Sequence, residues 1–339
     1  MAIKAFDTYS EYMQAVRPRM RFMPEENPKE WQARARVKLR EILGVPASSE
    51  VSAISVEWTH EEKDHTETRY TFASEPGAEV VCHLLLPRDA KPKSLPLAIC
   101  VQGHGTGMHI SLGRAKFEGD REDIEDGDRD FGRQALKRGF AALALEQRAF
   151  GERGAKEDGR PDCRQSAMAA LMLGRTLIGD RCLDVSRAID AVTSNYPQID
   201  TSRIAMMGNS GGGTTTIYAA ALDTRITAAM PSCALCGYYP SIGAQEHCLC
   251  NYIPGIMQWF DMGDIAALIA PRPLIVVNGT TDRSFPLTSA IEQVAVARRV
   301  YDRMGAGEKL RHVIGPEGHR FYAAPAWPQF ASATGWIKE

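Results

Sequence analysis

The chain has 339 residues and is almost neutral, with 40 lysines and arginines against 42 aspartates and glutamates. Hydrophobic residues make up 44% of it and charged residues 24%, ordinary values for a globular protein that exclude disorder, collagen and coiled coil as its main structure. The balanced charge argues against nucleic acid or an anionic membrane as the main partner.

Hydropathy and cysteine content indicate the cellular compartment in which the protein is expected. No stretch approaches the roughly 18 consecutive apolar residues of a membrane-spanning helix. Residues 1–19 carry no apolar core of the kind that a secretory signal needs. We therefore expect a cytoplasmic protein whose eight cysteines are free thiols rather than a disulfide scaffold. Nothing in the sequence sets the oligomeric state.

Residues 1–50 form a predicted helical N-terminal extension. Within it, Pro28 opens a periodic apolar segment, and Gly44 and Pro46 end that segment. The pattern then changes to short β-rich runs separated by charged or Pro- and Gly-containing turns. These runs cover residues 54–59, 68–72 and 80–86. They open a predicted catalytic domain that extends over residues 51–339.

The rest of the chain alternates apolar runs with helical patterns. The predicted strands cover residues 97–101, 141–145, 204–207, 227–230, 274–277 and 310–314. The predicted helices lie near residues 131–138, 183–196, 211–222, 288–304 and 326–337. Continuous apolar strands that alternate with helices indicate a parallel sheet covered on both faces. The sequence therefore predicts an α/β protein with one mixed sheet, antiparallel only at its start.

A nucleophile motif lies between the strand at 204–207 and the helix at 211–222. The residues Gly208-Asn209-Ser210-Gly211-Gly212 form G-x-S-x-G in the context that the motif requires, a strand, a sharp turn and a helix. Ser210 is therefore the predicted nucleophile. The amide of Gly211, at the helix N-terminus, is a predicted donor to the oxyanion of a tetrahedral intermediate.

A serine nucleophile needs a general base and a carboxylate that orients it. His319, in the loop after the strand at 310–314, is the predicted base, whereas His312 lies inside that strand. Asp282 leaves the strand at 274–277 and is the predicted acid, because the chain order in this type of sheet is Ser, acid, His. Glu317 is the alternative acid, although it is only two residues from the base.

The loop after the strand at 97–101 is expected to supply the second oxyanion donor. It reads Gln102-Gly103-His104-Gly105-Thr106-Gly107 and is similar to the His-Gly loops of esterases. Gly105 and Thr106 are the candidate donors, and the sequence does not separate them. His104 is interpreted mainly as a residue that holds this loop.

Two charged segments are interpreted as structural. Arg148 and Glu152 follow the strand at 141–145 and are expected to form a salt bridge that supports the site. The acidic run over residues 118–130 lacks the order of a calcium loop and is interpreted as a solvated loop leading into a helix.

A cysteine-rich insertion covers residues 233–262, with Cys233-x-x-Cys236 followed by Cys248-x-Cys250. Its apolar residues indicate a small cap over the site. The candidate substrate contacts are His104, Arg148, Tyr252 and Trp259. A zinc site at the two cysteine pairs is a less favoured alternative, so no metal and no cofactor are expected.

These motifs together make the chain resemble α/β-hydrolases of the acetyl xylan esterase and dienelactone hydrolase-like group over about residues 50–339. The matching segments are 102–107, 146–152, 173–177, 208–212, 278–282 and 315–319, with Asp184, Arg187 and Asp190. The chain departs from the cephalosporin-deacetylating branch, which has Arg-Gly-Gln where Arg148-Ala149-Phe150 stands here. It also has serine where true dienelactone hydrolases have a cysteine nucleophile.

The resemblance implies a carboxylic ester hydrolase, often a deacetylase of sugar esters, that needs no metal or organic cofactor. We expect a serine hydrolase that works through an acyl-enzyme on a small ester with a short acyl group, and no membrane or nucleic-acid partner. Three alternatives stay open. They are a serine peptidase or amidase of the prolyl oligopeptidase-like type, a metal-dependent hydrolase, and a non-catalytic binding protein on a hydrolase fold.

Overall fold

The computed structural model describes residues 5–46 and 53–337. The predicted boundary between extension and catalytic domain, at residues 50 and 51, lies outside these ranges. Within them, nine strands form one sheet in the order β1-β2-β3-β5-β4-β6-β7-β8-β9. The strands are β1 (Ser55–Glu61), β2 (His65–Glu75), β3 (Ala78–Pro87), β4 (Leu95–Val101), β5 (Ala141–Leu145), β6 (Ile199–Asn209), β7 (Ala228–Ser232), β8 (Leu274–Gly279) and β9 (Leu310–Gly315).

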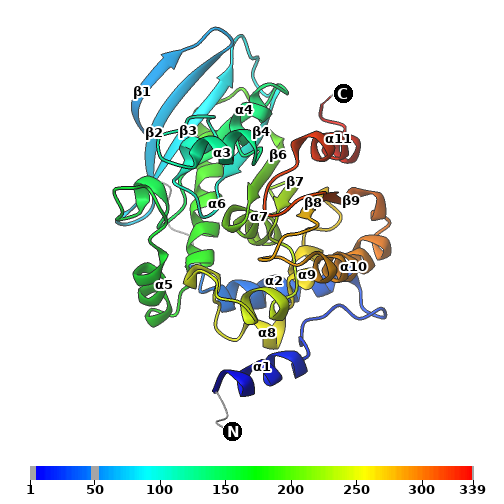
Figure 1. Cartoon of the computed structure of the whole chain (residues 1–339). Helices are drawn as coiled ribbons and strands as arrows, with labels where there is room; N and C mark the ends of the chain where they lie inside the picture. Colours follow the sequence, from blue (N-terminus) through cyan, green and yellow to red (C-terminus); the bar gives the residue numbers. More distant parts are fainter. Residues whose placement is uncertain (1–4, 47–52, 338–339) are drawn as a thin grey trace.

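The first strands of the sheet pair antiparallel and the remaining strands pair parallel. The antiparallel pairs are β1 with β2, β2 with β3, and β3 with β5. From β5 to β9 each neighbouring pair is parallel. The predicted fold class, a mostly parallel sheet with antiparallel strands at its start, is therefore confirmed. In Figure 1, β1 lies at one end of the molecule and α1 at the opposite end.

The α-helices of the described residues are α1 (Ala5–Ala15), α2 (Pro28–Leu43), α3 (Asp120–Glu125), α4 (Phe131–Leu136), α5 (Cys163–Met172), α6 (Leu177–Asn195), α7 (Gly211–Leu222), α8 (Ile256–Trp259), α9 (Met262–Ala267), α10 (Leu287–Arg303) and α11 (Ala323–Thr334). The sequence missed α3, α5, α8 and α9 as helices. Each of these has ten residues or fewer, too short for a clear helical period.

Alternate residues of the central strands face two different cores. In β4, Leu97 and Ile99 belong to a large core shared with α2, α6, α7 and α10. Ala98 and Cys100, which point to the other face, belong to a smaller core shared with α4 and α11. This period of two is the pattern of a sheet covered by helices on both faces, as predicted.

Helix α2 is integrated into the large core. Asn27 caps its N-terminus by accepting a hydrogen bond from the Lys29 amide at 2.9 Å, and Gly44 ends it in a left-handed conformation. Its side chains Trp31 and Leu39 are at most 1% exposed. Helix α2 therefore forms part of the core beside the sheet instead of a separate layer.

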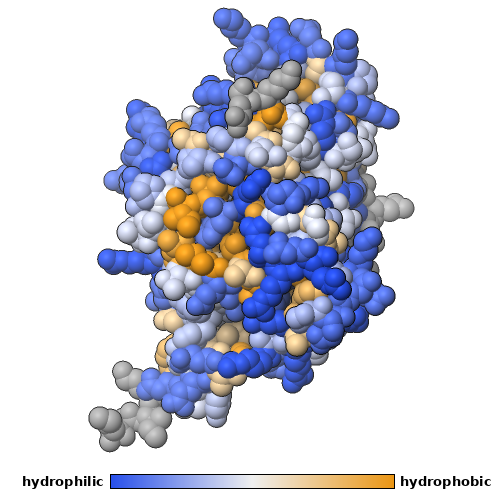
Figure 2. Space-filling model, turned by 90° about the vertical axis from the view of Figure 1, so that its right-hand side faces the viewer, coloured by the Kyte–Doolittle hydropathy of each residue, from blue (hydrophilic) through white to orange (hydrophobic). Residues whose placement is uncertain are grey.

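Figure 2 shows one face on which hydrophilic side chains surround a hydrophobic area near the middle. Among residues 5–46 and 53–337, no helix has the length and apolar character needed to cross a membrane.

Candidate active site

Ser210 stands at a sharp turn between β6 and α7. Its backbone has φ 55° and ψ −122°, a conformation that non-glycine residues rarely adopt and that is typical of strained functional turns. The turn packs tightly on β4, because a β-carbon at Gly212 would lie 2.3 Å from the carbonyl oxygen of Val101. Small residues are therefore required around the serine, as the motif predicts.

Asp282 and His319 form a direct pair in the loops that follow β8 and β9. The Nδ1 atom of His319 lies 2.8 Å from Oδ2 of Asp282. The other oxygen of Asp282 accepts hydrogen bonds from the amides of Ser284 at 2.9 Å and Phe285 at 3.1 Å. Burial alone would raise the pKa of Asp282, but the hydrogen bond and the electrostatic attraction of His319, together with the Phe285 amide, outweigh burial and hold this pKa below its usual value.

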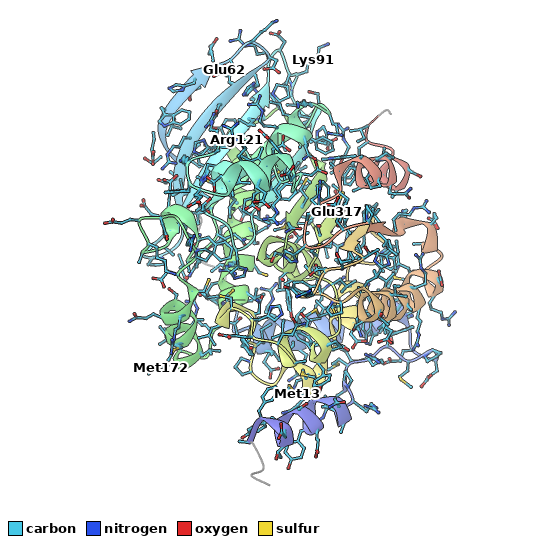
Figure 3. The ribbon with its side chains drawn as sticks, viewed as in Figure 1. Met13, Glu62, Lys91, Arg121, Met172 and Glu317 are labelled. Atoms are coloured by element: carbon cyan, nitrogen blue, oxygen red, sulfur yellow. The ribbon has the colours of Figure 1, made fainter. Side chains whose placement is uncertain are left out.

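The alternative acid and the alternative histidine have other partners. The carboxylate of Glu317, labelled in Figure 3, forms an ion pair with Arg320 at 3.1 Å. The Nε2 atom of His312 lies 3.1 Å from Oδ1 of Asn278, within the sheet, and burial lowers the pKa of His312 to about 4. The geometry thus singles out Asp282 as the carboxylate bound to His319.

Ser232, at the end of β7, connects the serine turn to the histidine loop. Its carbonyl oxygen accepts a hydrogen bond from the amide of Ser210 at 2.9 Å. Its hydroxyl donates to the carbonyl oxygen of Arg320, the residue after His319, at 3.1 Å. Because β6, β7, β8 and β9 are neighbours, the predicted nucleophile, acid and base all lie at the carboxyl edge of the sheet.

A chain of two aromatic contacts that ends on His319 was missed by the sequence analysis. The ring of Phe285 stacks on His319 with centroids 5.9 Å apart, and His247 of the insertion contacts Phe285 edge-on at 5.7 Å. Through His247, the insertion therefore reaches the carboxyl edge of the sheet, where His319 lies. No spacing rule connects His247 to His319, which lies more than 70 residues further along the chain.

The loop at 102–107 lies directly against Ser210. A β-carbon at Gly103 would lie 2.8 Å from the β-carbon of Ser210. The amide of Gly105 donates to the carbonyl oxygen of Gly103 at 2.8 Å. Within the described residues, the amide of His104 has no hydrogen-bond acceptor.

Asp120 anchors the far side of this loop. Its carboxylate accepts a hydrogen bond from the hydroxyl of Thr106 and lies 2.8 Å from Nε2 of His109. Asp120 is 1% exposed and begins helix α3. The interpretation of the acidic run as a solvated loop is therefore wrong at this residue, because two side chains and the amides of Lys116 and Phe117 enclose its carboxylate.

The expected salt bridge between Arg148 and Glu152 is wrong. The guanidinium of Arg148 binds Asp184 at 2.8 Å and Glu75 at 2.7 Å, whereas Glu152 binds Arg69 at 2.7 Å. These partners come from β2 and α6, so the pairing depends on tertiary structure and not on the short spacing of 148 and 152. Arg148 fixes the segment after β5 to these two elements.

Tyr252 and Trp259 lie next to the N-terminal segment. The indole of Trp259 packs beneath the cationic groups of Lys38 at 4.3 Å and Arg19 at 5.2 Å. Tyr252 lines a pocket of about 530 Å³ together with residues of α1 such as Tyr12 and Met13. The substrate contacts predicted for Tyr252 and Trp259 stay a prediction.

The two cysteine pairs of the insertion are separated in space. The thiol of Cys233 donates to the carbonyl oxygen of Arg320 at 3.2 Å, and its sulfur lies within 4.8 Å of ligand atoms of Asp282 and His319. The thiol of Cys236 lies against the carbonyl oxygen of Pro286. Cys250 instead lies beside His104, at 3.2 Å from Nε2. The four cysteines therefore do not gather around one point.

Comparison with known proteins agrees with this architecture. YtaP of Bacillus subtilis (strain 168), a protein named as a hydrolase, is 28% identical over 184 residues. The alignment covers 53% of this chain and spans only 60% of the length of that relative. Among solved structures, a protein of Bacteroides fragilis NCTC 9343 named as an acetyl xylan esterase superposes with a TM-score of 0.77 at 20% identity, over 93% of this chain and 83% of its own.

Two further solved structures share the fold at low identity. A glucuronoyl esterase from Solibacter usitatus has a TM-score of 0.65 at 16% identity, over 91% of this chain and 93% of its own. An acetyl xylan esterase from Paenibacillus sp. R4 has a TM-score of 0.59 at 18% identity, over 96% of this chain and 99% of its own. A family model described as Abhydrolase family matches residues 3–304. Since this match covers most of the chain and the sheet has the corresponding order, the chain belongs to the Abhydrolase family and has the α/β-hydrolase fold.

Proposed function

We propose that the protein is a serine carboxylic ester hydrolase. Ser210 attacks the acyl carbonyl carbon and gives its proton to Nε2 of His319, while Asp282 holds Nδ1 of the imidazole. The same proton then passes to the leaving alcohol as the tetrahedral intermediate collapses to an acyl-enzyme. Water, deprotonated by His319, attacks the acyl carbon and releases the acid and free Ser210.

The oxyanion of the intermediate needs two N–H donors near Ser210. The amide of Gly211, at the N-terminus of α7, is the first. The sequence indicated Gly105 or Thr106 for the second, but the amide of Gly105 already donates within its loop, and the side chain of Thr106 is bound to Asp120 on the far side of the loop. We propose the amide of His104 instead, because it directly follows Gly103, which touches Ser210, and has no acceptor within the described residues.

The observation that carries this proposal is the His319–Asp282 hydrogen bond, tied through Ser232 to the strained turn at Ser210. Stored backbone strain at a serine, next to an oriented imidazole, is typical of activated nucleophiles. The similarity to acetyl xylan and glucuronoyl esterases supports esters of carbohydrates, and acetyl esters in particular, as the substrate class.

The proposal is tested with purified protein on p-nitrophenyl esters of increasing acyl length, acetylated sugars and aminoacyl amides. We expect hydrolysis of short acyl esters and a loss of about 10³-fold or more in kcat for Ser210→Ala. The matched control is Ser166→Ala, at an exposed position of α5, which retains the parent rate.

Two outcomes would overturn the proposal. If Ser210→Ala hydrolyses p-nitrophenyl acetate as fast as the parent, Ser210 is not the nucleophile. If aminoacyl amides are cleaved and no ester of the panel is, the enzyme is an amidase or peptidase and the ester assignment is wrong.

A further inference from the structure

A second group of reactive side chains lies beside the catalytic edge and takes no part in the proposed chemistry. This thiol–imidazole cluster consists of His104, Cys163, Cys248 and Cys250. Its four potential ligand atoms all lie within 4.8 Å of one another. The residues come from the loop after β4, from the first position of α5 and from the insertion, so only the folded chain brings them together.

We propose that the thiol–imidazole cluster binds one zinc ion. Three thiolates and one imidazole are a donor set found in structural zinc sites. With Zn–S bonds of about 2.3 Å and Zn–N bonds of about 2.0 Å, the ligand atoms of a tetrahedron stand about 3.5–3.8 Å apart. The observed upper limit of 4.8 Å, with 3.2 Å between Nε2 of His104 and Sγ of Cys250, needs only small side-chain rotations to reach this geometry.

Burial and charge around the cluster fit a bound dication. Cys163 and Cys250 are at most 3% exposed, so the ion would be largely shielded from solvent. The guanidinium of Arg181, itself 1% exposed, lies 3.5 Å from Sγ of Cys163 and above the ring of Phe150. A zinc dication and this one guanidinium would balance three thiolates, which removes the cost of an uncompensated buried charge.

The site is closed, which indicates a structural metal. Four protein ligands complete a tetrahedron and leave no position for a metal-bound water or a substrate. The thiolates are soft ligands, which favour zinc over magnesium or calcium. Zinc here would connect the loop after β4, the start of α5 and the insertion.

The position of His104 connects the proposed metal site to the oxyanion donors, and this connection rests on the proposed function. A β-carbon at Gly211 would lie 2.9 Å from Cε1 and Nδ1 of His104, so the imidazole packs directly on the first oxyanion donor. A zinc ion bound to Nε2 would fix both this ring and the His104 backbone amide. The metal would thus preorganise the oxyanion site without touching the substrate.

The test measures metal in the intact protein, purified without chelators. We expect about one zinc per chain by inductively coupled plasma mass spectrometry. We also expect cobalt-substituted protein to show the visible bands of tetrahedral Co²⁺ and thiolate-to-cobalt charge transfer. Cys250→Ser should lose most of the zinc, whereas Cys236→Ser, equally buried but outside the cluster, should keep it.

Three outcomes would overturn the proposal. The first is a zinc content below about a tenth of an ion per chain together with no spectrum of bound cobalt. The second is an unchanged zinc content in Cys250→Ser, and the third is a disulfide between two cluster cysteines in the mass spectrum. The parent measurements do not depend on whether a variant folds. Ser210→Ala should keep its zinc, so failure of the metal proposal and failure of the esterase proposal are distinguishable.

Discussion

The carboxylate of Asp282 accepts three hydrogen bonds, one from His319 and two from backbone amides. Asp282→Asn should preserve this packing but hold the imidazole in the wrong tautomer. We expect kcat for p-nitrophenyl acetate to fall by about 10⁴-fold. Glu317→Gln, at the exposed carboxylate of the same catalytic edge, should change kcat only a few-fold. Equal losses in the two variants would contradict the assignment of the acid.

Glu146 gives a pH-dependent prediction. Complete burial raises the pKa of this carboxyl to about 7, although the amides of Met108 and Glu152 donate to it. The folded protein therefore keeps a proton on Glu146 that the unfolded chain releases at about pH 4.3. The contribution of this proton to the free energy of unfolding is complete below that pH and is lost as the pH rises to about 7.

Glu146→Gln should remove this decline. Between about pH 4.5 and pH 7.5, the free energy of unfolding of the parent should fall relative to the variant by about 3 kcal/mol. Urea unfolding of both proteins across this range measures the difference. Parallel pH profiles for parent and variant would show that Glu146 does not bind a proton in the folded state.

At the scale of residues, motif and chain order pointed to Ser210, Asp282 and His319, and the structure shows the hydrogen bond between the last two. The sequence could not predict the partners of Arg148 or the position of Asp120, because these contacts join segments far apart in the chain. The cysteines show the same limit. Short spacing suggested pairing Cys233 and Cys236 with the later pair, whereas the structure brings Cys163 and His104 to Cys250.

Among the elements, α2 offers a matched pair of substitutions that tests its contribution to stability. Leu39 is fully buried in the large core, whereas Val37, on the opposite face of the helix, is 70% exposed. Leu39→Ala should lower the free energy of unfolding by about 2–5 kcal/mol, because it removes apolar contacts and leaves a cavity. Val37→Ala is the matched control and should change it by less than about 0.5 kcal/mol.

Denaturant unfolding of the two variants measures this prediction. A small effect of Leu39→Ala would mean that the N-terminal segment folds apart from the sheet. The sequence located α2 from its period and its end signals, because these are local features. It described the segment as an extension because the burial of Trp31 and Leu39 against α6 and α7 depends on the assembled core.

The long elements were predictable because their patterns are strong. Each of the nine strands was located from an apolar or alternating run, and the order of α/β units gave the parallel sheet. The short helices α3, α5, α8 and α9 were missed because segments of ten residues or fewer show no clear helical period. The start of α3 also depends on contacts of Asp120 with Thr106 and His109, whereas the capping box of Asp261 and Asp264 at the start of α9 is a local signal that the sequence analysis missed.

For the whole molecule, the sheet brings residues from distant parts of the chain to one edge. The loop at 102–107, the serine turn and the two loops after β8 and β9 meet there, and the insertion reaches them through His247. The nearly neutral charge of the chain fits a small uncharged ester better than a polyanion. The thiol–imidazole cluster lies beside the serine turn, because His104 packs on Gly211. A zinc ion there would stabilise the loop at 102–107 and the insertion.

The central claim is that Ser210 is an activated nucleophile, and covalent labelling tests it most directly. The intact protein is treated with a fluorophosphonate, and the modified peptide is identified by mass spectrometry. The account predicts one adduct per chain, located on Ser210, that forms much more slowly in His319→Ala. An adduct on another serine, or none at all while the parent still hydrolyses esters, would contradict it.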